Sequence, residues 1–218
     1  MQVTVDGFLG GRLRLAQPKT GYRAGIDPVL LAAACPAQSG QEVLELGCGV
    51  GVASLCLGRR VPGLGLNGVE ILGEYAQIAR ENSVRNSIQF DVRQGDVSAR
   101  PTPFFDRSFH HVIMNPPYFS ADASSISPEA GRASGRSEQV ALSHWVDMAA
   151  KRLRPKGYLT VIQRVERLAD LLVALEGCLG SIVVQPLASR AGRPAHLILL
   201  RARKSGRAAF QLLSAQNL

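Results

Sequence analysis

The sequence predicts an α/β fold: a seven-stranded, mostly parallel sheet with helices on both faces. Two observations lead to this prediction. Short apolar runs of strand length alternate with helix-length segments between about residues 42 and 163, and such alternation requires parallel strands joined by right-handed crossovers. Several runs also end in glycines or polar residues. In α/β proteins, ligands bind at these strand exits.

The N-terminal part of the chain precedes this alternating pattern. Val3 to Leu15 looks extended, and a helix is expected to follow with Asp27 as its N-cap and Pro28 at its first position. The chain has 218 residues, of which 46% are hydrophobic, enough for one domain with a full core. We therefore expect a single domain over 1–218, with an extension and helix at 1–40 and the alternating core at 41–218.

The core elements follow in order. Helices are expected to begin at Val52 and to span Gly73 to Arg85. The last two strands are predicted to form an antiparallel hairpin that turns at Ser189 to Gly192. The seven strands are expected near residues 42–46, 64–70, 88–94, 109–114, 157–163, 181–187 and 195–203.

A glycine turn follows the first core strand and predicts a nucleotide-like ligand. Its glycines, Gly47, Gly49 and Gly51, allow close approach of a ligand to the backbone, and the next helix offers free N–H groups. The spacing G-x-G-x-G differs from the G-x-G-x-x-G of dinucleotide sites. Glu45 adds a negative charge that a pyrophosphate would disfavour. S-adenosylmethionine, with a sulfonium, an ammonium and no phosphate, fits better.

Two further acidic residues lie at later strand exits. Glu70 ends the second core strand 19 residues after Gly51, the distance at which a carboxylate reaches ribose hydroxyls. Asp96 and Val97 follow the third strand, where Asp96 could accept from an adenine amino group. The alternatives are a helix-start acid for Glu70 and a plain Gly-Asp turn for Asp96.

The tetrapeptide Asn115-Pro116-Pro117-Tyr118 follows the apolar run Phe109 to Met114. Prolines cannot extend a strand ladder, so the chain must leave the sheet here. An amide, a rigid turn and an aromatic ring are thus placed at one strand exit. A plain strand-ending turn is the simpler interpretation.

Together these motifs resemble the Rossmann-like class I methyltransferases that use S-adenosylmethionine, in the branch that modifies an sp² amino or amide nitrogen. The stretch Gln17 to Leu31 is similar to the opening of the bacterial tRNA adenine-N6 methyltransferases that act on valine tRNA next to the anticodon. The resemblance implies that Glu45 and Gly47 line the methionine half of the cofactor, Glu70 holds its ribose and Asp96 its adenine. Asn115 and Pro116 would then hold the target amino group.

The implied reaction transfers a methyl group to the exocyclic N6 of an adenine. Its lone pair is delocalised into the ring, and two acceptors, the Asn115 side-chain oxygen and the Pro116 carbonyl, would take its two hydrogens and make it more nucleophilic. Tyr118 would stack on the base. The Ser-, Ala- and Gly-rich segment 119–137 is expected to be a loop, either a substrate lid or a simple insertion.

Charge indicates an RNA partner. The net charge is +8, and no acidic residue follows Glu176. Such a basic stretch is the footprint expected of a protein that handles phosphate backbones, although a solvated basic face is an alternative. The stretch contains Arg190, Arg193, Arg201, Arg203, Lys204 and Arg207.

Three other functions stay open. A glutamine methyltransferase of the release-factor type shares the tetrapeptide but usually has a helical N-terminal domain, whereas Val3 to Leu15 looks extended. A small-molecule methyltransferase would not need the basic stretch, and a non-catalytic S-adenosylmethionine or RNA-binding protein would not need the filled catalytic positions.

The sequence says less about where the protein resides in the cell and whether it forms oligomers. The first residues have neither a basic nor an apolar signal region, and the longest apolar stretch is too short to span a membrane. We therefore expect a cytoplasmic protein with no membrane contact. The cysteines lack ligand spacing, so no metal is expected. The oligomeric state is left open.

Overall fold

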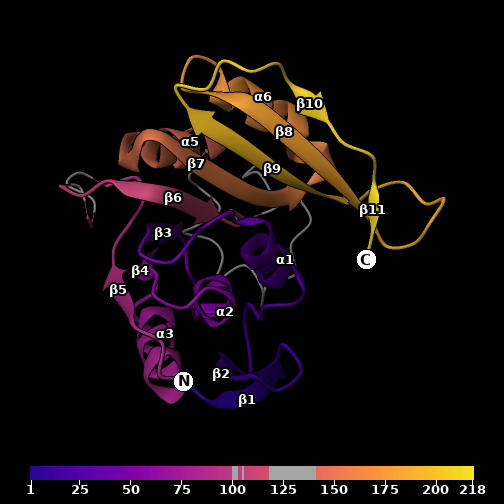
Figure 1. Cartoon of the computed structure of the whole chain (residues 1–218). Helices are drawn as coiled ribbons and strands as arrows, with labels where there is room; N and C mark the ends of the chain where they lie inside the picture. Colours follow the sequence, from indigo (N-terminus) through magenta and orange to yellow (C-terminus); the bar gives the residue numbers. More distant parts are fainter. Residues whose placement is uncertain (100–102, 105, 118–140) are drawn as a thin grey trace.

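A twisted central sheet separates two groups of helices in the computed structural model, which describes residues 1–99, 103–104, 106–117 and 141–218 (Figure 1). The parallel strands run in the order β5-β4-β3-β6-β7, and β9 and β8 follow with β9 antiparallel to both neighbours. The mostly parallel sheet and the antiparallel hairpin are thereby confirmed. The strands are β3 (Glu42–Leu46), β4 (Gly65–Glu70), β5 (Phe90–Gln94), β6 (Phe109–Met114), β7 (Leu153–Arg164), β8 (Leu179–Ala188) and β9 (Leu197–Lys204).

Two predictions about the strands need correction. Within the described residues the sheet has nine strands rather than seven, because β10 (Gln211–Leu212) and β11 (Gln216–Asn217) pair with the outer edge of β8. Two-residue strands have no hydrophobic period of their own and form only where an edge is available to pair with. Strand β7 also begins at Leu153, four residues before the predicted start, directly after a helix.

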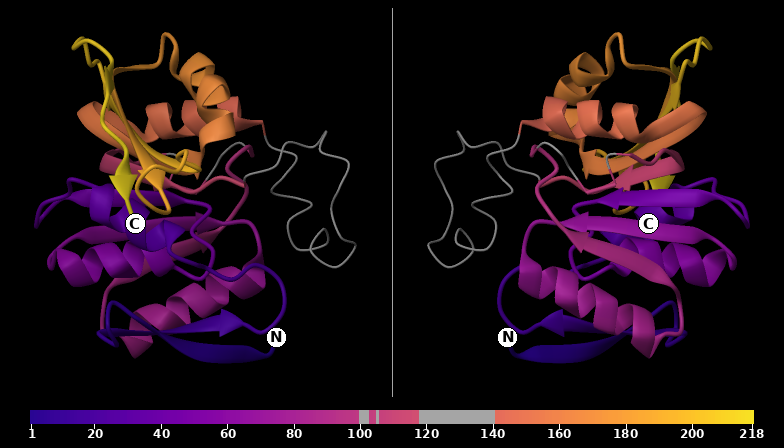
Figure 2. Two further views of the ribbon diagram at one scale, coloured as in Figure 1. Left: turned by 90° about the vertical axis from the view of Figure 1, so that its right-hand side faces the viewer. Right: turned by 90° about the vertical axis from the view of Figure 1, so that its left-hand side faces the viewer.

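Helices cover both faces of the sheet, as predicted, and the two groups lie on opposite sides in Figure 2. The helices of each group pack against the strands and bury one hydrophobic cluster. One face carries α1 (Asp27–Ala34), α2 (Val52–Arg60) and α3 (Gly73–Arg85), and the other carries α5 (Leu142–Arg152) and α6 (Leu168–Leu175). A short 3₁₀ turn, η1 (Val165–Arg167), precedes α6. None of the helices in the described ranges combines the length and apolar character that a membrane crossing needs.

The N-terminal segment forms a separate hairpin, β1 (Val3–Phe8) and β2 (Leu13–Pro18), on the outer side of α2 and α3. A fully buried side chain, Asn82 of α3, connects it to the core. Its Oδ1 accepts from the Ala16 amide at 2.7 Å, and its Nδ2 donates to the carbonyls of Ala16 and Val50. The hairpin is thus tied to the glycine turn that follows β3.

The predicted N-cap of α1 is wrong. Asp27 is the first helical residue, and Ile26 occupies the cap position without a side-chain hydrogen bond. Pro28 is accordingly the second helical residue rather than the first, still within the first turn. An acidic residue inside the first turn still favours the helix dipole.

The register of the parallel strands brings their carboxyl ends to one level. Leu46 pairs with Val69 on one side and with Met114 on the other, and Met114 pairs with Val161. From β3 the chain continues to β4 on one side, while β6 lies on the other side. The space between β3 and β6 is therefore the switch point of the sheet, where α/β proteins bind ligands.

Candidate functional site

The turn after β3 depends on glycine at three positions. Gly47, Gly49 and Gly51 have φ angles of 66°, 53° and 87°, in the left-handed region that side chains disfavour. Gly51 is the N-cap of α2. The turn is held from the neighbouring strand, because the Cys48 amide donates to the Val69 carbonyl at 3.0 Å. The predicted motif thus forms a rigid backbone cradle at the start of a helix.

The indole of Trp145, on α5, lies directly over this cradle. A Cβ added at Gly47 would lie 2.7 Å from Cη2 of Trp145, so only glycine fits there. Trp145 is 5% exposed, and its Nε1 is buried without an acceptor among the described residues. Trp145 was not predicted from the sequence, because nothing in the pattern of α5 distinguishes it from core packing.

Glu45 lies beneath the glycine turn and is 4% exposed. Its Oε2 accepts from the Ser54 hydroxyl at 2.5 Å and from the Ser54 amide at 3.0 Å, in the first turn of α2. Burial raises the pKa of Glu45 to about 8, although both bonds from Ser54 lower it. A nearby cation would favour the charged form, so this carboxyl suits a positively charged ligand.

Glu70 joins the ends of β3 and β4. Its Oε2 accepts from the Gly49 amide at 2.8 Å, and its Oε1 accepts from the Leu72 amide at 2.9 Å. Burial raises the pKa of Glu70, and the backbone amides of Leu72, Gly49 and Ile71 act in the opposite direction. The carboxylate therefore fixes the glycine turn, a role that the sequence did not indicate.

Asp96 and Val97 lie at the same edge, just beyond β5, and the amide of the preceding Gly95 donates to the Glu70 carbonyl. Asp96 Oδ1 accepts from the amide and the hydroxyl of Ser98, both at 2.7 Å. This is the Asp-turn geometry that was the alternative interpretation. The Val97 side chain packs in the core cluster with Leu46 and Val69.

Asn115 and Pro116 follow β6, and the pairing of Leu46 with Met114 places them beside Gly47. Asn115 Oδ1 is fully buried, and no group of the described chain donates to it. A buried carbonyl oxygen without a donor costs about 1–3 kcal/mol. Such an atom at a strand exit, next to a glycine cradle, is suited to receive a donor from a substrate.

Gln163, at the end of β7, is a second residue that the sequence analysis missed. Its Nε2 donates to the carbonyls of Pro116 at 3.2 Å and Pro117 at 3.4 Å, and it is completely buried. The available signal was a polar residue directly after the apolar pair Val161 and Ile162.

Two predicted features of the site lie beyond the residues that the structure describes. Tyr118 and the segment 119–137 lie outside the described residues. Within the described ranges, no cluster of His, Cys, Asp and Glu could hold a metal ion. A cavity of about 370 Å³ opens elsewhere, between α1 and strands β7 to β9, and none of the predicted site residues lines it.

Known sequences similar to this chain are methyltransferases. The family model described as methyltransferase small domain matches residues 24–184. The tRNA1(Val) (adenine(37)-N6)-methyltransferase of Yersinia enterocolitica is 29% identical over 97% of this chain and 85% of its own length. The enzyme with the same name from Porphyromonas gingivalis is 31% identical, over 76% of this chain and 68% of its own length.

Solved structures share the fold. A predicted O-methyltransferase from Agrobacterium tumefaciens has a TM-score of 0.71 at 23% identity, covering 88% of this chain and 86% of its own. A 16S rRNA N2 methyltransferase of T. thermophilus, solved with AdoMet and guanosine, has a TM-score of 0.64 at 21% identity, covering 93% of this chain and 50% of its own. At these identities the likeness concerns the fold alone.

Proposed function

Because the chain belongs to the methyltransferase small domain family, we propose that it transfers a methyl group from S-adenosylmethionine to N6 of an adenine in tRNA. The observation that carries the proposal is the buried Asn115 Oδ1, which lacks a donor among the described residues and follows β6 beside the glycine turn. Relatives that cover most of the chain are named for adenine 37 of tRNA1(Val), and we propose the same nucleotide here.

The residues around the glycine turn fit the cofactor. When bound, S-adenosylmethionine supplies an electrophilic methyl group on a positively charged sulfur. At the left-handed Gly49 the backbone is open to a ligand, since a Cβ there would meet nothing within 4 Å. Glu45 and Glu70 supply buried carboxyls for a ligand with cationic and hydroxyl groups. We propose Glu70 for the ribose and Asp96 for the adenine of the cofactor.

The target amino group would lie between Asn115 and Pro116. Two oxygens, Asn115 Oδ1 and the Pro116 carbonyl, would accept its two N–H groups and draw its lone pair out of conjugation with the ring. Neither group needs to remove a proton before transfer. Most of the rate gain would be positional, since alignment of two reactants contributes roughly 7–11 kcal/mol. The adenine must leave its stack, which costs least in a loop.

The basic residues near the C-terminus fall into separate groups along the chain. Arg201 and Arg203 lie over the ring of Tyr158, 5.8 and 5.3 Å from its centroid. Lys204 Nζ donates to the carbonyls of Ala150 and Leu153, where α5 ends. Lys204 lies toward the opposite end of the sheet from Asn115, because Leu153 pairs with Phe109 at the start of β6. Arg201 pairs with Thr160, which lies close to the level of Asn115.

Arg190 and Arg193 lie instead in the β8–β9 turn, at the carboxyl ends of the parallel strands. Both are exposed. The turn is joined to the end of β7, because the Val165 amide donates to the His196 carbonyl at 3.1 Å. Strand β7 in turn contacts the Asn115–Pro116 turn through Gln163. We propose that this β8–β9 turn carries the phosphate contacts nearest to the target base.

Replacement of Arg190 and Arg193 by alanine together should weaken tRNA binding and flatten its salt dependence. Each lost phosphate contact reduces the slope of log K against log salt by about 0.7 for single-stranded RNA, so up to about 1.4 units should disappear. Fluorescence anisotropy of labelled tRNA at several salt concentrations measures both effects.

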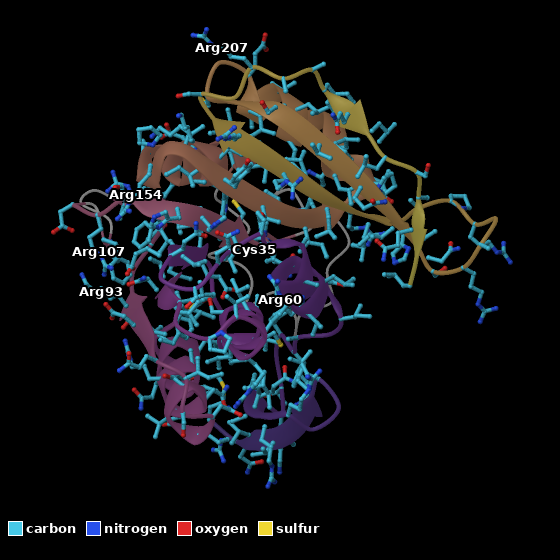
Figure 3. The ribbon with its side chains drawn as sticks, in the orientation of Figure 1. Cys35, Arg60, Arg93, Arg107, Arg154 and Arg207 are labelled. Carbon is cyan, nitrogen blue, oxygen red and sulfur yellow. The ribbon has the colours of Figure 1, made fainter. Side chains whose placement is uncertain are left out.

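The matched control removes the same charge at other exposed positions. Arg154 and Arg207 lie away from the β8–β9 turn, on the left and at the top of Figure 3. Their double alanine variant should keep most of the wild-type slope. Equal flattening by both double variants would refute a specific role for the turn and leave only a net-charge effect.

Nucleoside analysis tests the proposed reaction directly. Bulk tRNA lacking the modification, incubated with the protein and S-adenosylmethionine, should gain N6-methyladenosine. Labelling of a release factor instead, with no change in tRNA, would refute the RNA assignment and favour a glutamine substrate.

A further inference from the structure

Gln163 is hydrogen-bonded through both ends of its amide. Its Nε2 donates to the carbonyls of Pro116 and Pro117, and its Oε1 accepts from the Arg164 amide at 2.9 Å. The side chain is completely buried. A buried amide is costly unless both its oxygen and its nitrogen are hydrogen-bonded. These hydrogen bonds therefore fix the orientation of the Gln163 side chain.

The hydrogen bonds of Gln163 join β7 to the chain just beyond β6, where the regular strand pairing has ended. Pairing between β6 and β7 ends at Met114 and Val161, and two residues further along the strands Pro116 stands opposite Gln163. Pro116 and Pro117 have no N–H group and cannot donate to a neighbouring strand. A side-chain amide from β7 therefore supplies the interaction that orients both proline carbonyls.

We propose that Gln163 is a positioning residue for methyl transfer, which orients the Pro116 carbonyl and, through the rigid turn, Asn115 Oδ1. A carbonyl oxygen has two lone pairs. Gln163 occupies one on Pro116 and leaves the other for an N–H of the substrate. This inference rests on the proposed function only in the assignment of Asn115 and Pro116 as acceptors.

Gln163→Glu separates positioning from packing. A carboxylate has the shape of the amide but cannot donate, whereas a protonated carboxyl can. Next to two carbonyl oxygens in a buried site the neutral form is favoured, which raises its pKa. We expect kcat on tRNA to be about tenfold or more below wild type near about pH 8, and to recover relative to wild type near about pH 6. The dissociation constant for S-adenosylmethionine should stay at the wild-type value.

Two further variants complete the design. Gln163→Leu cannot donate at any pH, so its low kcat should show no recovery in acid. Thr160→Val removes a buried hydroxyl that has no partner among the described residues, from the same strand, and should retain the wild-type kcat and pH profile. A Gln163→Leu variant with wild-type kcat, or a Gln163→Glu variant whose low kcat does not recover in acid, overturns the inference.

A measurement that does not depend on catalysis distinguishes failure of the positioning role from failure of the proposed function. Pro116-Pro117 is the only Pro-Pro pair of the sequence, so proline labelled with carbonyl ¹³C and ¹⁵N gives one directly coupled carbonyl signal. This signal should shift in Gln163→Leu and, for Gln163→Glu, return toward the wild-type position in acid. An unchanged signal refutes the positioning role, whereas an inactive wild-type protein on tRNA refutes only the proposed function.

Discussion

Replacement of Asn115 by alanine should reduce turnover by about 10²–10³-fold, the range found when one preorganised hydrogen-bonding group is lost from a transition state. The side chain contributes a buried oxygen that no group of the described chain uses, so its removal leaves no donor among these residues unpaired. Affinity for S-adenosylmethionine should stay within about threefold, because only interactions that strengthen in the transition state change the chemical step. Single-turnover kinetics on tRNA and titration calorimetry with the cofactor measure the two quantities.

Asn86→Ala is the matched control. Asn86 bonds to the backbone of Arg14 through both ends of its amide and connects α3 with the N-terminal hairpin. Its loss should lower thermal stability while turnover stays near the wild-type value. Wild-type turnover in Asn115→Ala would place the acceptor elsewhere. A parallel loss of cofactor affinity would assign Asn115 to the cofactor pocket.

Replacement of Glu70 by alanine should weaken S-adenosylmethionine binding by roughly 10- to 100-fold. Hydrogen bonds to a charged group contribute about 1.5–3 kcal/mol, and about 1.4 kcal/mol corresponds to tenfold in affinity. Two effects add here, because the proposed ribose contact disappears and the Gly49 amide loses its acceptor, which loosens the glycine turn. Titration calorimetry at constant pH measures the change.

Glu74→Ala controls for the change in charge. Glu74 is an exposed acid in the first turn of α3, four residues beyond Glu70. Its removal should leave cofactor affinity within about twofold, since exposed charges are screened by solvent. If Glu70→Ala bound the cofactor as tightly as wild type, Glu70 would be a structural acid that only ties the glycine turn to β4.

Sequence patterns predicted the local structure of the core. Helix α3 begins and ends at the predicted residues, Gly73 and Arg85, because its apolar period and its limits are local properties of the chain. The glycine turn and the exit after β6 were predicted for the same reason, since glycine and proline restrict the backbone wherever they occur. The two-residue strands β10 and β11 lack such a signal and exist only because the edge of β8 is free to pair.

The sequence by itself determined which residues stand at the strand exits: Glu45, Glu70, Asp96 and the Asn115–Pro116 turn. Only the tertiary structure decided what each of them contacts. Strand direction placed Arg190 and Lys204 toward opposite ends of one sheet, although both lie in the same basic stretch. Register brought Gln163 to Pro116 across 47 residues of chain. The spacing of residues along the chain determines on which face and at which end of an element each residue lies. Contacts between elements depend instead on the pairing of strands far apart in sequence.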